Sequence, residues 1–343
     1  MKNKFFIRLR SWEYWPIWVT YLPAYFYYIW LAVKARSFFF FSSTNPGIEN
    51  GGMLGESKIK ILDKIRAKPK TLFFSPDKAA EEIINDLERA NITYPFIAKP
   101  DIGERGWGVK RIDDVSALND YLNTFKTNFL VQEYVDLPVE AGVFYYRYPE
   151  AEKGRISSIV IKEMLTVTGD GKATLRELIC NDNRALLQLD KLEKTMNGEM
   201  ERILSSGQAM ELVSIGNHCL GTTFLDGTHL ADEQMTAVFD EIAHEISGFY
   251  FGRFDLRCAS IAHLKRGEVM IMELNGAGAE PAHIYQPGFS FFSAQRVLLH
   301  HFSVMYEISR SNRKRGVKHM TFAAGLQEIK KLSRYNKEKA KHG

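Results

Sequence analysis

Two apolar segments in the C-terminal third of the chain, at 252–257 and 269–275, carry polar residues at alternate positions. Each segment lies in a predicted β-strand, the first near 252–262 and the second near 268–274, and successive side chains of a strand point to opposite faces. The first strand then carries two arginines and an aspartate on one face, and the second carries a glutamate and an asparagine on one face. If the strands are neighbours, two carboxylates and one amide converge on one side of a sheet.

A cluster of oxygen ligands on one sheet face suits a hard divalent cation. Mg²⁺ prefers carboxylate and amide oxygens and leaves positions for phosphate and water. We therefore expect Asp255, Glu273 and Asn275 to hold Mg²⁺, with Mn²⁺ as an alternative. Arg253 and Arg257 are candidate catalytic residues, because arginines there would stabilise charge on a transferring phosphoryl group and on a tetrahedral intermediate. A surface ion-pair ladder would explain the opposite charges, but not a carboxylate followed by Asn and a glycine-rich stretch.

A glycine-rich loop lies earlier in the chain. A predicted strand ends at Lys99, and the loop over residues 101–108 contains Gly103, Gly106 and Gly108. Glycines let backbone N–H groups approach phosphate oxygens closely, and a lysine adds a point charge. The spacing matches neither a Walker A motif nor a Rossmann loop. An ordinary β-hairpin with a glycine turn would produce the same pattern, and it remains the alternative.

The next predicted strand and the residues after it suit a nucleoside. The backbone of Gln132, Glu133, Tyr134 and Val135 could read the edge of adenine, and the Glu140 carboxylate could accept both ribose hydroxyls. An edge strand with acidic residues facing solvent is equally compatible with this pattern.

The N-terminal segment is aromatic and has basic flanks. Residues 15–33 contain no charged side chain, and positions 1–36 hold six Lys or Arg against one acid. The segment contains Pro16 and Pro23 and is rich in Trp and Tyr, which prefer the membrane interface to its centre. Three readings are open: docking on a membrane surface through residues 12–41, packing on this chain or a partner subunit, and a true span.

Composition excludes several classes of protein. A chain of 343 residues with 45% hydrophobic content can bury a core of several lobes. Cys180, Cys219 and Cys258 form no CxxC pair, which argues against a disulfide framework and a zinc site and fits a cytoplasmic location, including the inner face of the membrane. Positions 313–343 hold ten basic and two acidic residues. No nucleic-acid-binding pattern accompanies this charge, so we expect no nucleic-acid partner.

Taken together, these residues resemble the ATP-grasp superfamily, and within it the D-alanine:D-alanine ligase-like and carboxylate–amine ligase-like proteins. The resemblance covers roughly residues 55–300. Its strongest part is a GR-x-D strand followed by an E-x-N strand, which Arg253, Asp255, Glu273 and Asn275 match.

The family resemblance also implies roles for other residues. In this family a lysine before a mobile glycine loop contacts the nucleotide phosphates, as Lys99 would here. The hinge strand and the ribose carboxylate correspond to residues 132–135 and to Glu140. A second nucleotide lysine is expected upstream, and Lys70 is the candidate. Residues 167–174 resemble a segment of cyanophycin-synthetase-like and glutamate-ligase-like members, which implies an amino-acid or peptide-like substrate.

The fold that the resemblance implies is an α+β ATP-grasp fold in which two lobes sandwich ATP, with a shortened N-terminal lobe. The expected organisation is an aromatic segment over 1–44, the shortened lobe over 45–92, a central ATP-binding lobe over 93–165, a C-terminal lobe with the Mg²⁺ site over 166–312 and a basic tail over 313–343.

The implied activity is an ATP- and Mg²⁺-dependent ligase that joins a small carboxylate to an amine through an acyl phosphate. Residues 276–281 do not match the hydroxyl-containing turn of D-alanine ligases, so specificity for D-alanine is not implied. An ATP-grasp phosphotransferase and a non-catalytic, membrane-associated nucleotide-binding protein are the alternatives. Homo-oligomerisation is left open.

Overall fold

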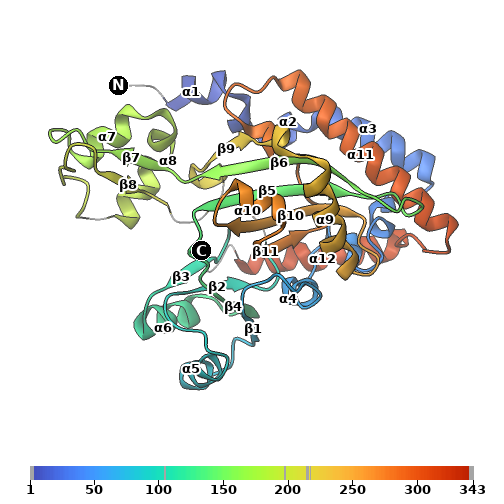
Figure 1. Cartoon of the computed structure of the whole chain (residues 1–343), viewed down its shortest axis with the longest axis horizontal. Coiled ribbons are helices and arrows are strands. Elements are labelled where there is room, and N and C mark those ends of the chain that lie inside the picture. The colour runs from blue at the N-terminus through green and yellow to red at the C-terminus, as the bar shows by residue number, and fades with distance from the viewer. Residues whose placement is uncertain (1–3, 104–105, 197, 214–215, 217, 340–343) are drawn as a thin grey trace.

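The computed structural model describes residues 4–103, 106–196, 198–213, 216 and 218–339. Glu104 and Arg105 of the predicted glycine loop, and the ends of the predicted N-terminal segment and basic tail, lie outside the described residues. The chain is an α+β protein with two antiparallel sheets and a two-stranded ribbon (Figure 1), which confirms the predicted fold class at this level.

The first sheet is small and has helices on one face. Its four strands, in the spatial order β1-β4-β2-β3, are β1 (Thr71–Phe74), β2 (Phe96–Pro100), β3 (Lys110–Ile112) and β4 (Phe129–Glu133). Phe96 and Val131 on one face pack against Leu87 of α5 (Ala80–Arg89) and Tyr121 of α6 (Val115–Thr124). The alternation of β2 then turns Lys99 to the opposite face.

The second sheet has five antiparallel strands. In the spatial order β11-β10-β5-β6-β9 they are β5 (Val139–Tyr146), β6 (Arg155–Glu163), β9 (Thr223–Asp226), β10 (Phe251–Cys258) and β11 (Val269–Asn275). The chain passes from the first sheet to the second between β4 and β5. That crossing lies within the range 93–165, which the sequence grouped as one lobe.

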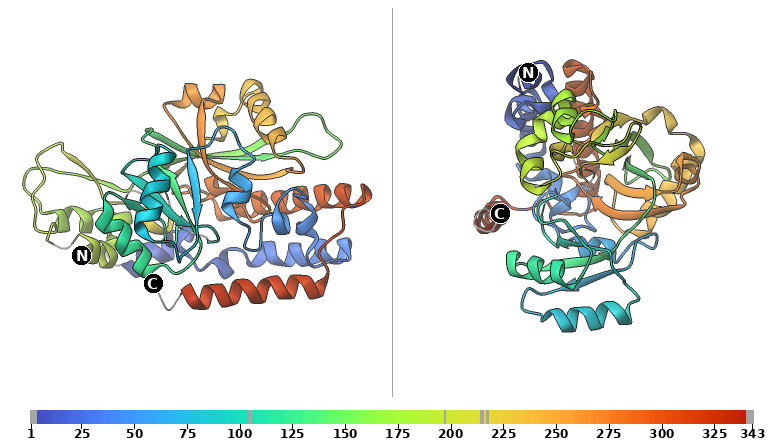
Figure 2. Two further views of the ribbon diagram at one scale, coloured as in Figure 1. Left: turned by 90° about the horizontal axis from the view of Figure 1, so that it is seen from below. Right: turned by 90° about the vertical axis from the view of Figure 1, so that its left-hand side faces the viewer.

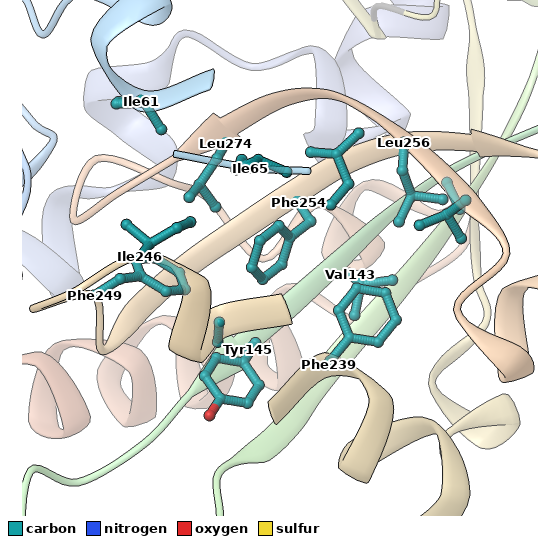
Figure 3. Packing of buried hydrophobic residues seen from close by; sticks show 14 of the residues in the cluster. Ile61, Ile65, Val143, Tyr145, Phe239, Ile246, Phe249, Phe254, Leu256 and Leu274 are labelled. Carbon is teal, nitrogen blue, oxygen red and sulfur yellow. The ribbon is translucent and has the colours of Figure 1, made fainter. Parts of the chain in front are cut away.

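One face of the second sheet forms the main apolar core. Phe254 of β10 contacts the rings of Phe239 and Phe249 at centroid distances of 5.6 and 5.5 Å, and Figure 3 shows these side chains beneath the strands with Val143 and Leu256. The helices on this core are α4 (Lys58–Leu62), α9 (Glu233–Glu245) and α10 (Ile261–Arg266).

The second sheet differs from the sequence prediction at the end of β10. The sequence predicted a strand near 252–262, but β10 ends at Cys258 and α10 begins at Ile261. The Ser260 side chain accepts a hydrogen bond from the backbone N–H of His263 and so caps the helix. A serine before a short helical turn is a start signal that the apolar run obscured.

A small unit with its own core is inserted between β6 and β9. Its elements are β7 (Thr166–Thr168), α7 (Leu175–Asn181), α8 (Asn183–Thr195) and β8 (Ala209–Glu211). Thr174 and Glu177 form a capping box at the start of α7, and Leu175, Ile179 and Leu192 are buried together. The unit lies to one side of the second sheet in Figure 1.

Helices from both ends of the chain cover the other face of the second sheet. Those packed on it are α3 (Leu22–Ala35) and α11 (Phe291–Lys314). The other helices of the two ends are α1 (Lys4–Arg10), α2 (Ile17–Thr20) and α12 (Phe322–Lys339), and short 3₁₀ turns occur along the chain at Trp12–Tyr14, Phe40–Ser43, Glu49–Gly51, His218–Leu220, Thr228–Leu230 and Ala282–Tyr285. Leu31 of α3 and Ile308 of α11 pack with Phe144 and Phe251 of the sheet. Figure 2 shows α3 and α11 side by side.

The aromatic segment is therefore divided between packing and exposure. Phe39, Phe40 and Phe41 are buried in the core between the terminal helices and the second sheet, whereas Phe38 and one side of α3 are exposed. Within the described residues, no helix is both long and apolar enough to cross a membrane.

A buried asparagine joins the chain after the aromatic segment to the second sheet. The side chain of Asn45 is fully buried, and its amide donates to the carbonyls of Gly51 and Phe251 at 2.9 and 2.8 Å. Its Oδ1 accepts from the N–H groups of Tyr250 and Phe251, both at 2.9 Å. One side chain therefore satisfies four backbone groups, three of them at the start of β10 and one at Gly51.

We predict that Asn45→Leu lowers the free energy of unfolding by about 2–4 kcal/mol, because a side chain of similar volume would leave several buried backbone groups unpaired. Urea denaturation measures the loss. Asn123→Leu, at an exposed position of α6, is the matched control and should leave the transition unchanged. Equal transitions for both variants would contradict the role given to Asn45.

Candidate functional site

The two sheets meet at a buried lysine. Lys99 of β2 is only 6% exposed, and its ammonium donates to Oε1 of Gln132 at 2.9 Å and to the carbonyl of Met272 in β11 at 3.0 Å. Within the described part of the chain, no carboxylate forms an ion pair with it. Burial therefore lowers the pKa of Lys99 to about 8, although the nearby carboxylate of Glu273 opposes the shift.

The glycine loop follows Lys99 and lies against a second lysine. The Lys58 ammonium donates to the carbonyl of Gly103 at 2.6 Å and lies 3.4 Å from Oε1 of Glu273. Gly106 and Gly108 have φ values of +73° and +66°, a region that glycine enters without strain. The loop and the sheet of Glu273 thus converge on the ammonium of Lys58.

Asp101, at the start of the loop, fixes the position of Lys58. Its buried carboxylate accepts from the Ser57 hydroxyl at 3.1 Å and from the N–H of Ile59 at 3.0 Å. Its carbonyl accepts from the N–H of Lys58 at 3.2 Å. The first turn of α4 is therefore bound to the loop through Asp101.

Lys70, the sequence candidate for the second nucleotide lysine, lies elsewhere. Its exposed ammonium donates to the carbonyl of Asn91 at 3.0 Å, and its backbone pairs with Glu133. The structure places Lys70 beside the predicted hinge, whereas Lys58 lies beside the glycine loop and Glu273.

The predicted hinge connects the two sheets. Gln132 is buried and contacts Lys99, while the carbonyl of Val135 accepts from Nη1 of Arg257 at 2.9 Å. The ring of Tyr134 lies 6.0 Å from the Arg257 guanidinium. Arg257 therefore contacts the hinge from the second sheet.

A row of buried charges crosses three strands of the second sheet. Arg257 and Lys162 bind the Glu140 carboxylate at 2.8 and 3.1 Å. Lys162 also lies 3.2 Å from Asp255, which Arg253 binds through Nη2 at 2.9 Å. Burial would raise the pKa of Asp255, but the cations Arg253 and Lys162 outweigh it and hold this pKa at about 2.

A glycine makes room for this row. Gly142 of β5 lies between Asp255 of β10 and Val160 of β6 in the strand register. A Cβ atom there would come within 2.8 Å of Val160 Cγ1, 3.1 Å of Arg253 Cδ and 3.2 Å of Asp255 Oδ1. A side chain at position 142 would therefore crowd the ion pair between Arg253 and Asp255.

The predicted neighbours on β10 and β11 are confirmed. Asp255 pairs with Glu273, and Arg253 pairs with Asn275. Nδ2 of Asn275 donates to Oδ2 of Asp255 at 2.8 Å. Two carboxylates and one amide thus lie together on adjacent strands, as the alternation predicted.

These three side chains fit Mg²⁺ by their chemistry, since all offer hard oxygen donors. Asp255 already accepts bonds from Lys162 and Arg253, whereas Glu273 forms an ion pair with Lys58 and with no other cation that the structure describes. No group of three His, Cys, Asp or Glu side chains in the described ranges is placed to hold a metal ion. A cation would therefore need Asn275 and oxygens from a ligand as well.

Arg253 extends the site towards the N-terminal segment. Its Nη1 donates to the carbonyl of Glu280 at 2.8 Å, and the Glu280 carboxylate accepts from the Tyr285 hydroxyl at 3.3 Å. That hydroxyl lies 3.5 Å from the hydroxyl of Tyr21. The aromatic segment thus lies three contacts from Arg253, through Glu280 and Tyr285.

Sequence reasoning missed Lys58 and Lys162. Lys162 lies in a strand of mostly apolar residues, and its partners Glu140 and Asp255 appear only when the strand register is known. Lys58 begins a short helix and looks like an ordinary surface residue. One feature of the sequence could have identified Lys58: Ser57 is a helix-capping residue, and the helix that it starts precedes the first strand.

Comparison with known proteins gives structural matches only. No protein-family model and no curated protein matches the sequence. A D-alanine–D-alanine ligase from Bacillus anthracis is 13% identical, with a TM-score of 0.39, over 75% of this chain and 67% of that one. The VanG D-Ala:D-Ser ligase from Enterococcus faecalis is 16% identical, with a TM-score of 0.38, over 71% of this chain. A bifunctional glutathione synthetase from Pasteurella multocida is 15% identical, with a TM-score of 0.37, over 72% of this chain.

The chain spans 36% of the glutathione synthetase and 58% of the VanG ligase. The matches include the D-alanine ligase type that the motifs of the sequence resemble. Since the TM-scores lie below 0.5, the function proposed below rests on the residues of this chain.

We predict that the buried charge of Lys99 destabilises the fold below its pKa of about 8. Between this pKa and that of an exposed lysine, the unfolded chain binds more protons than the folded chain, so stability rises with pH. Relative to Lys99→Met, the wild type should gain about 2 kcal/mol between about pH 7.5 and about pH 9.5.

Urea denaturation of both proteins at the two pH values measures this difference. Lys191→Met, at an exposed position of α8, is the control and should follow the wild type. Parallel pH profiles for the wild type and Lys99→Met would show that the ammonium is not destabilised by burial.

Proposed function

We propose that this chain is an ATP- and Mg²⁺-dependent ligase that activates a carboxylate as an acyl phosphate and joins it to an amine. The observation that carries the proposal is the position of Lys99. Among the described residues, its buried ammonium bonds to neutral oxygens, which is costly for a buried charge, and a bound anion would offset that cost. Lys58 brings a second ammonium to the same region, which suits the phosphates of a nucleotide.

The nucleotide would lie between the two sheets. We assign Lys58 and Lys99 to the phosphates, together with backbone N–H groups of the glycine loop. The hinge over residues 132–135 would contact the adenine, and Glu140 the ribose. Arg257 holds both Glu140 and the carbonyl of Val135, so we assign it to positioning that end of the site.

Asp255, Glu273 and Asn275 would hold Mg²⁺. The ion, when bound, supplies charge neutralisation to the phosphates. We assign Arg253 and Lys162, which flank Asp255, to stabilising charge on the transferring phosphoryl group. Positioning and electrostatics then account for most of the catalysis.

The reaction has two steps. A carboxylate oxygen of the acid attacks the γ-phosphorus of ATP, the bond to the bridging oxygen breaks, and ADP leaves. The amine then attacks the acyl carbon, phosphate leaves, and the amine nitrogen loses a proton to form the amide. We place the acid near Arg253, because its guanidinium lies between Asp255 and the Glu280 carbonyl. An amino-acid or peptide-like acid is the substrate class that the turn over 167–174 suggests.

We predict that the purified chain, incubated with Mg-ATP, hydroxylamine and a panel of amino acids and small carboxylic acids, forms a hydroxamate with one acid and releases ADP in equal amount. Glu273→Gln should lower this rate by about 100-fold or more, because it removes a charge from the phosphoryl-transfer site. Glu268→Gln, at an exposed position next to the same strand, is the matched control and should retain the wild-type rate.

Glu273→Gln is a cleaner probe than Asp255→Asn. Asp255 neutralises two buried cations, so its loss would also destabilise the fold, by about 3–5 kcal/mol.

Two outcomes of the hydroxamate assay would contradict the proposal. ADP release without any hydroxamate would favour a phosphotransferase, and a fully active Glu273→Gln protein would contradict the metal site.

We further predict that Lys58→Met weakens ATP binding by about tenfold or more, because a charge-assisted bond to phosphate is lost. Lys70→Met should leave the affinity unchanged. Isothermal titration of ATP into both variants compares the two lysines directly. Loss of affinity only in Lys70→Met would reverse the assignment and support the lysine that the sequence suggested.

A further inference from the structure

Helix α3 exposes a continuous apolar stripe. Leu22, Phe26, Ile29 and Val33 follow one another at helical spacing and are 47%, 67%, 50% and 71% exposed. Trp18 of α2, at 65% exposure, continues the stripe towards the N-terminus. Single exposed apolar residues are ordinary, but a contiguous set of this size marks an interaction surface.

The helix that carries this stripe is firmly attached to the protein. On its opposite side, Ala24, Leu31 and Ala32 are buried against α11 and against the buried phenylalanines 39–41. The Tyr27 hydroxyl shares a hydrogen bond of 2.7 Å with Ser303 of α11. The exposed stripe is therefore a fixed outer surface.

Helix α12 extends the apolar surface. Phe322, Leu326 and Ile329 are exposed at helical spacing on it. A cavity of about 810 Å³ lies between the end of α3 and the start of α12, and Ile29, Val33, Phe38, Met320 and Phe322 are among its lining residues. Figure 2 shows α12 running along the same side of the molecule as α3. We call the exposed residues of α2, α3 and α12 named here the apolar face.

Positive charges lie beside the apolar face, at the cavity between α3 and α12. Arg36, Arg313 and Lys318 line the same cavity. Before Glu49 the sequence has a single acid, Glu13, and its side chain is buried in an ion pair with Arg184 at 2.7 Å. The apolar residues are thus bordered by basic residues with no exposed acid from the N-terminal segment among them.

We propose that the apolar face docks on the surface of an anionic lipid bilayer. Trp and Tyr side chains on a surface helix favour the interface between headgroups and acyl chains, and a basic border attracts anionic headgroups. A second copy of the chain would place two basic borders against each other, and their repulsion disfavours that occupant. The basic cavity would receive the headgroup of a lipid whose chains lie along Ile29, Val33 and Phe322.

Vesicle flotation of the full chain tests this proposal. We expect binding to vesicles of equal parts phosphatidylcholine and phosphatidylglycerol, and about tenfold or more weaker binding to phosphatidylcholine alone. Phe26→Glu/Val33→Glu should weaken binding to the mixed vesicles by about tenfold or more, because two exposed apolar side chains no longer enter the interface. Phe73→Glu/Ile203→Glu, at exposed apolar positions elsewhere, is the matched control and should bind as the wild type does.

A second pair of variants tests the charge. The double variant Arg313→Glu/Lys318→Glu should weaken binding to the mixed vesicles by about fivefold or more for each positive charge lost. The control variant Lys126→Glu/Lys191→Glu should bind as the wild type does. Equal binding to both kinds of vesicle, or none to either, would overturn the proposal. So would a dimer that the face variants convert to a monomer without any vesicle binding, since the face would then be an interface between copies. None of these outcomes depends on ligase activity.

Discussion

Buried charges that alternate in sign hold the second sheet in its register. Arg257, Glu140, Lys162, Asp255 and Arg253 form one connected row across three neighbouring strands. Each acid in this row has two cationic partners, so removing Glu140 would leave Arg257, and removing Asp255 would leave Arg253, without its counterpart in the row. Such losses cost about 3–5 kcal/mol in proteins, far more than the net value of an intact pair. The row therefore restricts how these strands can pair.

The packing of the sheet is arranged around this row. The alternation that brings Asp255 to one face turns Phe254 and Leu256 to the other, where they form the core with α9. Along the polar face, the charges give way to Phe144 and Phe251, which lie beneath the terminal helices. One face of the sheet thus contains both the candidate site and the attachment point of the N-terminal segment. This arrangement explains why an aromatic segment far from the site in sequence lies close to Arg253.

The sequence predicted the elements whose pattern is local. The strands that carry Asp255 and Glu273 were identified by their alternation, and their pairing is confirmed. The partners of Lys162 were not predictable, because they depend on the register of three strands. The sequence also could not predict which side of the aromatic segment is buried. Its composition fits burial and membrane contact alike, and only the position of α11 decides which side of α3 is buried.

Helix α12 connects the apolar face to the glycine loop. Phe322 and Leu326 belong to the apolar face, while further along the same helix the Tyr335 hydroxyl donates to the carbonyl of Ile102. The ring of Tyr335 also lies 6.0 Å from that of Trp107, on the other side of the loop. Because a helix is stiff over this length, a surface that holds the first turns of α12 also restrains the residues that contact the loop. Helix α12 therefore connects the apolar face to the glycine loop of the candidate nucleotide site, although these two regions are far apart in the sequence.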